Sequence, residues 1–353
     1  MKYTTFAKTD IQLSKLSFGA MGLNCAFGNY EETDLIKSIH HSLDQGVNVI
    51  DTARAYMDSE VIVGKALKQW KGEKPFIASK AIPAEAKDNA GWGIPNPATV
   101  AYPKGAVRKS VETSLQKLDI ETIDLLQLHQ FWGQFHGEGT WMAELQALKQ
   151  EGKINHIGVS IVDHRHDGAL ALVQSGLIDS VQTIINIFDP LAFDSLIPAC
   201  QENDVFVIAR CVLDEGGLTG MLTPETQFDP GDFRADYFEH GPRSEYIARV
   251  DKLRSYIPEY ADSLSELAIR FAITHPGVST ACISMHIPKF ADENIRSAAK
   301  GPLPQSVFEE IRRQHRWLHN LYGGKYFPSA EAQTETLGVG SFKTMESTQT
   351  LDF

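Results

Sequence analysis

The stretch Val47-Asn48-Val49-Ile50-Asp51 decides the fold of this chain, because it is a short apolar run, rich in Val and Ile, that ends at an acidic residue. A continuous apolar run of this length suits a strand that is buried on both faces, which is typical of a parallel sheet. Seven further runs of the same kind occur along the chain, at residues 16–19, 76–79, 123–128, 156–159, 181–185, 205–209 and 278–283.

Segments with helical spacing lie between these runs, at residues 33–43, 59–70, 104–118, 141–150, 168–174, 195–202 and 264–274. Glycine follows a helix where the helix is expected to end, as in Asp44-Gln45-Gly46. Strands that alternate with helices in this way predict an α/β fold, a closed (β/α)8 TIM barrel. The rival architecture, an open doubly wound sheet, would need a GxGxxG turn after the first strand, and Gly19-Ala20-Met21-Gly22 does not supply one.

Three stretches are longer than ordinary barrel loops. Residues 81–103 and 214–260 follow the third and seventh predicted strands, so we expect both to lie on the C-terminal rim, where barrel enzymes bind substrate. Residues 1–300 are predicted to form the barrel. Residues 301–353 are predicted to form a C-terminal helix and an extended tail that packs on the barrel or on a neighbouring subunit, which leaves a homo-oligomer open.

Charge and cysteine usage limit the partners and the compartment. The net charge of −12 argues against a nucleic-acid or anionic-membrane partner, since both need a basic face. No apolar run approaches the ~20 residues of a membrane span, and the N-terminal residues match neither a signal peptide nor a transit peptide. Four cysteines without a CxxC pair favour a reducing cytoplasm. The His40-His41 pair and the histidines within residues 163–167 lack an HExxH frame, so no metal site is predicted.

Polar residues stand at the C-terminal ends of the second, third and fourth predicted strands. Asp51 closes the second strand and Tyr56 follows five residues later, whereas Lys80 and His129 close the next two strands. Each of them alone has an ordinary structural explanation, such as a helix cap or a snorkelling lysine. The ends of neighbouring barrel strands converge on one pocket, so together these residues predict a proton-transfer site.

The chemistry of this site follows from the side chains. A tyrosine hydroxyl has a pKa near ~10 in water, which is too high for easy proton exchange at neutral pH. We expect the Lys80 ammonium to lower the pKa of Tyr56, and Asp51 to hold that ammonium in place. His129 would donate a hydrogen bond to a substrate carbonyl. No side chain donates a hydride, so the site requires a cofactor.

The chain resembles the aldo-keto reductases over about residues 1–300. The resemblance is carried by an ordered set of motifs: Asn48-Val49-Ile50-Asp51-Thr52-Ala53, Tyr56 with Ser59-Glu60, Ala78-Ser79-Lys80, Ile123-Asp124-Leu125-Leu126-Gln127-Leu128-His129, Gly158-Val159-Ser160, Val181-Gln182 with Asn186, and Gly217-Leu218-Thr219-Gly220. It implies a catalytic tetrad of Asp51, Tyr56, Lys80 and His129, with Tyr56 as the general acid. It also implies an NAD(P)(H)-dependent oxidoreductase that transfers a hydride between nicotinamide and an aldehyde, ketone or alcohol.

The resemblance further implies the contacts of the cofactor, which would lie extended across the strand ends. Gly19, Met21 and Asp51 would border the nicotinamide ribose, and Ser160 and Gln182 would contact the carboxamide. The remaining contacts would come from the loop along ribose and pyrophosphate and from the adenosine site, and they are Arg210, Cys211, Leu213, Gly217, Leu218, Gly220, Ser284, His286, Glu293 and Asn294.

Several residues depart from the family pattern. Ile161 replaces an Asn beside the carboxamide, Arg210 replaces the aromatic residue that stacks on nicotinamide, and Met221 replaces a loop Lys. The sequence Ile283-Ser284-Met285-His286 stands where basic residues near the adenosine 2′-phosphate are expected. We therefore expect NADP(H) to be favoured over NAD(H) less strongly than in the family, with use of both cofactors left open. We also expect the preference to grow as the pH falls through the titration of His286.

The substrate is expected to be small and polar or sugar-like, because Arg210, Asp214 and Glu215 place charge near the chemistry. Aromatic residues are predicted to wall the pocket, with Trp92 and Trp132 as the substrate contacts and Phe131, Phe188 and Tyr237 as further candidates. Two alternatives stay open. One is a cofactor-binding barrel that acts as a regulatory or interaction subunit, which the complete tetrad argues against. The other is a metal-dependent hydrolase, for which His129 is the one ligand found at a strand end.

Overall fold

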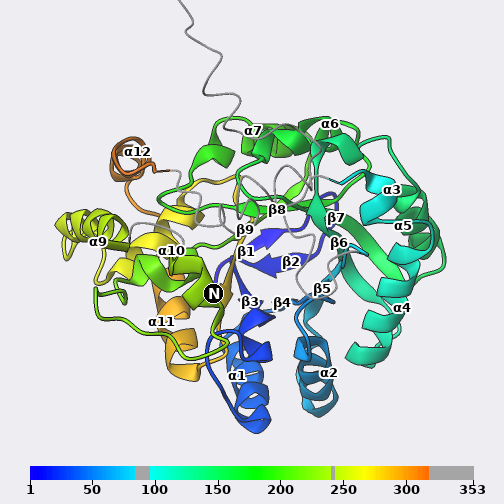
Figure 1. Cartoon of the computed structure of the whole chain (residues 1–353), viewed down its shortest axis with the longest axis horizontal. Helices are drawn as coiled ribbons and strands as arrows, with labels where there is room; N and C mark the ends of the chain where they lie inside the picture. The colour runs from blue at the N-terminus through cyan, green and yellow to red at the C-terminus, as the bar shows by residue number, and fades with distance from the viewer. Residues whose placement is uncertain (85–95, 240–242, 318–353) are drawn as a thin grey trace, which may run out of the picture.

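The computed structural model describes residues 1–84, 96–239 and 243–317 of the 353-residue chain (Figure 1). Within them, eight parallel strands close into a barrel in the order β10-β3-β4-β5-β6-β7-β8-β9. The strands are β3 (Leu16–Gly19), β4 (Val49–Asp51), β5 (Phe76–Ala81), β6 (Ile123–Phe131), β7 (Ile154–Ile161), β8 (Ser180–Ile184), β9 (Phe206–Arg210) and β10 (Thr280–Ser284). The predicted barrel is confirmed, and the strand bounds differ from the predicted ones by a few residues.

Helices surround the barrel in Figure 1. The predicted ones are present as α1 (Glu32–Asp44), α2 (Ser59–Gln69), α4 (Ala106–Leu118), α5 (Trp141–Gln150), α6 (Leu170–Gln174), α7 (Leu196–Glu202) and α10 (Leu264–Thr274). Helix α11 (Pro288–Ala299) follows β10 and was not predicted, although its Pro at the first helical turn is a start signal. No helix among the described residues is long and apolar enough to cross a membrane.

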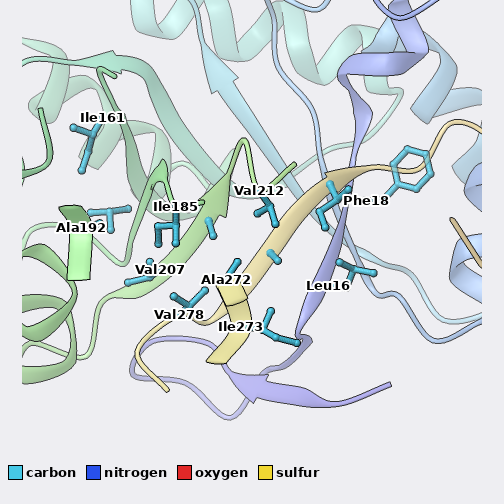
Figure 2. Close-up of a cluster of buried hydrophobic side chains, with 14 of the residues drawn as sticks. Leu16, Phe18, Ile161, Ile185, Ala192, Val207, Val212, Ala272, Ile273 and Val278 are labelled. Atoms are coloured by element: carbon cyan, nitrogen blue, oxygen red, sulfur yellow. The ribbon is translucent and has the colours of Figure 1, made fainter. Parts of the chain in front are cut away.

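The main core lies between the barrel and the helices. Successive side chains of a strand point to opposite sides, so alternate residues such as Leu16 and Phe18 of β3 and Val207 of β9 face outward. They contribute to the same buried cluster as Ala272 and Ile273 of α10 (Figure 2), and each of these five side chains is at most 8% exposed. Burial on both faces of each strand explains why the strands read as continuous apolar runs.

The N-terminal end of the barrel is closed by a hairpin that was not predicted. Strands β1 (Tyr3–Thr5) and β2 (Gln12–Ser14) pair antiparallel. Phe6, in the turn between them, is fully buried among the first side chains of the barrel interior. Its ring centroid lies 5.1 Å from Phe76, 4.8 Å from His156 and 4.9 Å from Phe206. The interior is therefore filled at this end, which leaves the C-terminal end for a site.

The long stretches carry short elements of their own. Helix α3 (Ala98–Ala101) lies in residues 81–103, and α8 (Phe233–Glu239) and α9 (Arg243–Lys252) lie in residues 214–260. Helix α12 (Gln305–Gln314) follows the barrel, and its Phe308 packs on Phe271 of α10 with ring centroids 5.0 Å apart. The predicted tail falls beyond residue 317, outside the described residues, so its packing and the homo-oligomer stay predictions.

Candidate active site

The side chains of the predicted tetrad lie together at the C-terminal end of the barrel. Asp51 ends β4, Lys80 lies near the end of the adjacent β5, and His129 lies on the next strand, β6. Tyr56 lies in the turn before α2. The Lys80 Nζ atom is 5.1 Å from the centroid of the Tyr56 ring, and the Tyr56 and His129 rings are 5.4 Å apart and edge-on.

Lys80 is fully buried and makes two hydrogen bonds at its ammonium. It donates to Asp51 Oδ1 and, at 2.8 Å, to the Thr52 carbonyl oxygen. Burial opposes its positive charge, but the neighbouring Asp51 and Tyr56 outweigh that effect and raise the pKa of Lys80. Lys80 therefore remains an ammonium, paired with a carboxylate that keeps it in place.

Tyr56 and His129 are both uncharged, and each can donate a hydrogen bond. Burial raises the pKa of Tyr56 to about 12, although Lys80 acts in the opposite direction. Lys80 lowers the pKa of Tyr56 as expected, but the pKa still rises, because loss of hydration disfavours the phenolate more than one cation stabilises it. Burial also lowers the pKa of His129 well below its usual value, and Lys80 and Arg210 act in the same direction.

Asp51 has two amide partners besides Lys80, and the Cys282 thiol also hydrogen-bonds with it. Gln182 Nε2 donates to Asp51 Oδ2 at 2.9 Å, and Gln127 Nε2 approaches the same oxygen at 3.3 Å. Gln182, which was predicted to contact a carboxamide, lies on β8, and Ser160 of β7 is its neighbour in register. Gln127 was missed by the sequence reasoning. Its signal was position, since it precedes His129 by two residues and so faces the same side of the strand.

The predicted nicotinamide-ribose residues also lie at this rim. Gly19 ends β3 and is the register neighbour of both Asp51 and Ser284. Met21 follows in the 3₁₀ helix η1 (Ala20–Asn24) and is half-buried. Gly19 and Asp51 end their strands and Met21 follows β3, so these residues lie at the C-terminal end of the barrel.

The loop after β9 contains the predicted pyrophosphate residues and is held in an unusual backbone conformation. Cys211, Asp214 and Glu215 have φ values of 53°, 48° and 53°, a left-handed region that non-glycine residues rarely adopt. The Asp214 carboxylate accepts hydrogen bonds from Tyr237 of α8 at 2.6 Å and from Tyr246 of α9 at 2.7 Å. The inserted helices therefore anchor the 3₁₀ helix η6 (Asp214–Thr219).

Steric crowding explains why position 217 of this loop is a glycine. A Cβ atom there would lie 2.1 Å from the Tyr246 hydroxyl oxygen, so a side chain would displace the tyrosine that anchors Asp214. Leu218 beside it is fully buried, and Gly220 closes the segment with a positive φ of 78°. Leu213, which precedes the segment, is half-buried.

Arg210 ends β9 and is paired within the site. Its Nη2 atom donates to Asp163 and, at 2.9 Å, to the Ile161 carbonyl oxygen. Burial opposes its charge, but Asp163 raises the pKa of Arg210 well above its usual value. The Ile161 side chain lies in the core shown in Figure 2 and offers the site only its backbone. Cys211 Sγ donates to Glu215 Oε1 at 3.3 Å, and burial raises the pKa of Glu215 to about 7.

The predicted adenosine end is less basic than its sequence suggested. His286 is 8% exposed, with its ring 4.9 Å from Tyr30 and 6.0 Å from Phe27, and its Nδ1 atom lies 2.8 Å from Ser284 Oγ. Burial lowers the pKa of His286 to about 4, and the Arg234 charge acts in the same direction. The expectation that His286 gains charge as the pH falls toward 6 is therefore wrong. Glu293 and the buried Asn294 lie on α11.

Arg234 is a cation near His286 that the sequence reasoning missed. Its guanidinium lies 5.7 Å from the Phe27 ring and 5.3 Å from the Phe228 ring. Asp232 accepts hydrogen bonds from it, at 2.9 Å from Nε and 2.5 Å from Nη2, so its charge is already compensated.

The sequence profile of the Aldo/keto reductase family matches residues 15–315. This chain belongs to the aldo-keto reductase family. The predicted family is thereby confirmed, and with it the general activity, since aldo-keto reductases are NAD(P)H-dependent oxidoreductases that act on carbonyl groups.

Relatives of this aldo-keto reductase are found among curated proteins and solved structures. The aldo-keto reductase YhdN of Bacillus subtilis (strain 168) is 30% identical over 292 residues, which cover 80% of this chain and 84% of that protein. The NADH-specific methylglyoxal reductase of Escherichia coli (strain K12) is 29% identical over 332 residues, which cover 89% of this chain and 100% of that protein. The holo form of the aldo-keto reductase AKR11C1 from Bacillus halodurans has the same fold, with a TM-score of 0.72, 24% identity and coverage of 91% of this chain and 99% of that one.

The aromatic residues predicted to wall the pocket of the reductase are mostly structural. Phe131 is 1% exposed and packs on Trp141. It faces away from the pocket because the β6–β7 register is irregular between Leu128 and Phe131, which turns the strand. Phe188 is also 1% exposed and packs on Tyr246, and the buried Tyr237 binds Asp214. Trp92 lies outside the described residues.

Trp132, one of the described candidates, lines a cavity with a volume of about 700 Å³. The cavity lies among the loops after β6, β7 and β8, and no member of the tetrad lines it. Its other walls are mostly polar: Gly133, Gln134, His164, Arg165, His166, Asp167, Gly168, Leu191, Asp194, Ser195 and Arg316. The histidines of this region bind Asp189, at 2.7 Å from His164 and 3.3 Å from His166. No group of three or more His, Cys, Asp or Glu residues within the described ranges could hold a metal ion.

Proposed function

We propose that this reductase transfers a hydride between a nicotinamide cofactor and a small polar carbonyl compound or alcohol, with Tyr56 as the general acid in reduction and the general base in oxidation. The observation that carries the proposal is the grouping of the Tyr56 ring 5.1 Å from the Lys80 ammonium and 5.4 Å from the His129 ring. A protonated phenol beside a buried cation is suited to give its proton to a carbonyl oxygen and to stabilise the charge that remains.

The roles divide among the side chains as follows. Tyr56 transfers the proton, and Lys80 stabilises the phenolate that forms when the proton leaves. Neutral His129 donates a hydrogen bond that orients the carbonyl oxygen toward Tyr56. Asp51 keeps Lys80 charged. The nicotinamide ring, when bound, supplies the hydride.

The residues at the strand ends fit the nicotinamide end of such a cofactor. Gln182 offers an amide beside Asp51, and Ser160, its neighbour in register, offers a hydroxyl, as recognition of a carboxamide requires. Gly19 and Met21 would border the ribose, and the anchored loop from Arg210 through Cys211 to Gly220 would follow the pyrophosphate. Ser284, His286, Glu293 and Asn294 would hold the adenosine.

Use of both NADP(H) and NAD(H) is the expected cofactor behaviour. Neutral His286 does not provide a cation for a 2′-phosphate, and Arg234 is already paired with Asp232. A lost charge-assisted contact lowers affinity by roughly ten- to a hundredfold, which removes most of the usual discrimination. The name of the NADH-specific methylglyoxal reductase, 29% identical, fits a weak preference for the phosphate.

A small polar substrate is favoured by the rim of the barrel. Arg210 ends β9 at this rim, and its charge acts on both Tyr56 and His129, so a charged side chain stands beside the tetrad. A charged group near the reacting carbonyl suits a short keto-aldehyde or polyol better than a large apolar ketone.

A panel of substrates with both cofactors tests the proposal. Methylglyoxal, glyceraldehyde and glycerol are assayed with NADPH or NADP⁺ and with NADH or NAD⁺, alongside a steroid ketone as the apolar contrast. We expect turnover of the small polar compounds with either cofactor. Turnover of the steroid ketone alone would contradict the substrate class, and absence of turnover with every pair would contradict the reaction itself.

A further inference from the structure

Gln127 is a buried side chain whose amide is directed at the tetrad. It lies on β6 two residues before His129 and is fully buried in the barrel interior. Its Nε2 atom is 3.3 Å from Asp51 Oδ2, while its Oε1 atom is buried and has no hydrogen-bond partner. If the Gln127 amide were flipped, its oxygen would face the Asp51 carboxylate. Repulsion between the two acceptors disfavours that orientation. Among the described residues, the Gln127 amide therefore interacts with Asp51 alone.

Space for this side chain comes from Gly158 of the Gly-Val-Ser motif. Gly158 lies on β7, and its register neighbours are Gln127 on β6 and Ser180 on β8. A Cβ atom at Gly158 would lie 3.1 Å from Gln127 Cγ and 2.2 Å from Ser180 Oγ. A side chain at this position would force the neighbouring side chains aside, so the glycine allows Gln127 to cross the interior toward Asp51.

We propose that Gln127 is a positioning residue that fixes the Asp51 carboxylate for Lys80. Lys80 holds only Oδ1 of Asp51, whereas Gln127 and Gln182 both donate to Oδ2. Donors on both oxygens prevent the carboxylate plane from turning, and this keeps the Lys80 ammonium directed at Tyr56. A buried carboxylate also needs such donors to stay charged away from water.

Gln127 and Gln182 differ in what else they can do. The Gln182 amide, under the proposed function, also meets the cofactor carboxamide. Gln127 precedes His129 by two residues and, within the part of the chain that the structure describes, has no second partner. Loss of Gln127 should therefore slow the chemical step alone, whereas loss of Gln182 should also weaken cofactor binding.

The test rests on the proposed tetrad and begins with Gln127→Met, which keeps the length of the side chain and removes the donor. We expect kcat to fall about tenfold, the effect of one lost hydrogen bond to a charged group, with the Kd of NADPH from fluorescence titration unchanged. Ser180→Ala is the matched control, because Ser180 lies in the same interior region and its Oγ atom has no partner. It should leave kcat unchanged.

A double-mutant cycle with Asp51→Asn separates positioning from packing. If Gln127 acts through Asp51, Gln127→Met should cause no further loss of kcat in the Asp51→Asn background. A full additional tenfold loss there, or an unchanged kcat in the single variant, would overturn the inference. If Asp51→Asn itself leaves kcat unchanged, the proposed function fails instead.

Gln127→Glu serves where the Met variant does not fold. An introduced carboxyl can donate to Asp51 only while the two groups share a proton, so kcat should approach the parent value near pH 6 and decline as the pH rises to 9. A ratio of variant to parent kcat that stays constant over this range would overturn the inference.

Discussion

Burial of Tyr56 and His129 decides what each residue can donate. Burial raises the pKa of Tyr56 to about 12, and Lys80 only moderates that shift. Burial also keeps His129 neutral by lowering its pKa well below the usual value. A protonated phenol and a neutral imidazole can both donate hydrogen bonds to one carbonyl oxygen, which is the arrangement that carbonyl reduction needs.

The first prediction at this scale concerns Tyr56→Phe. Removal of the proton donor should lower kcat by about 10²-fold or more, while the Kd of the cofactor changes little. Steady-state kinetics and fluorescence titration measure the two quantities. Tyr3→Phe is the control, since Tyr3 lies in the hairpin at the closed end of the barrel and donates to the Gly46 carbonyl oxygen. Retained turnover in Tyr56→Phe would reject the acid–base assignment.

The second prediction concerns His286 and cofactor choice. With a pKa of about 4, His286 is neutral at both pH 6 and pH 8, so it cannot make the selectivity change between them. The ratio of the NADP⁺ and NAD⁺ dissociation constants should stay constant within about threefold, apart from the titration of the phosphate itself. A ratio that favours NADP⁺ by a further tenfold at pH 6 would show that His286 becomes charged on binding.

The loop after β9 shows how one element depends on others. Its three left-handed residues are unfavourable in isolation, and they persist because Tyr237 and Tyr246 hold Asp214 from two separate helices. The function of the 214–260 stretch therefore includes anchoring of this loop. The length of this stretch predicted that it lies at the rim, but it did not predict the contact of Tyr237 and Tyr246 with Asp214.

The third prediction concerns the charge of Glu215 in the same loop. Its pKa of about 7 is above the usual value for Glu, so it is neutral at pH 6 and negative at pH 8. If a pyrophosphate runs along this loop, cofactor affinity should fall several-fold as the pH rises through about 7, because like charges repel. Glu215→Gln should abolish this pH dependence, and Glu225→Gln, an exposed change in the same stretch, should preserve it. Equal pH dependence in all three proteins would place the pyrophosphate elsewhere.

At the scale of the whole molecule, the barrel is filled at one end and carries polar side chains at the other. Phe6 closes the N-terminal end against Phe76, His156 and Phe206. The polar interior residues Gln127, Lys80 and Asp51 lie farther along the strands. Stability and chemistry are thus concentrated at opposite ends, as is usual for this architecture.

The fourth prediction follows from this separation. Phe6→Ala should lower the free energy of unfolding by about 3–5 kcal/mol, the usual effect of deleting a fully buried phenylalanine ring. Denaturant titration measures the loss, and kcat of the folded variant should remain close to the parent value. Phe290→Ala is the control, because Phe290 is 47% exposed and should change stability little. A comparable loss in both variants would show that Phe6 does not close the barrel.

The sequence by itself determined the barrel and the grouping of Asp51, Tyr56, Lys80 and His129. Both follow from local signals, since a short apolar run predicts a buried strand and the residue that closes a strand lies at the rim. Tertiary structure alone decided the rest. The raised pKa of Tyr56, the neutral His286, the contact of Gln127 with Asp51 and the outward turn of Phe131 all depend on residues far apart in the chain. Burial, hydrogen bonding and register arise only when distant segments meet, and no local pattern records them.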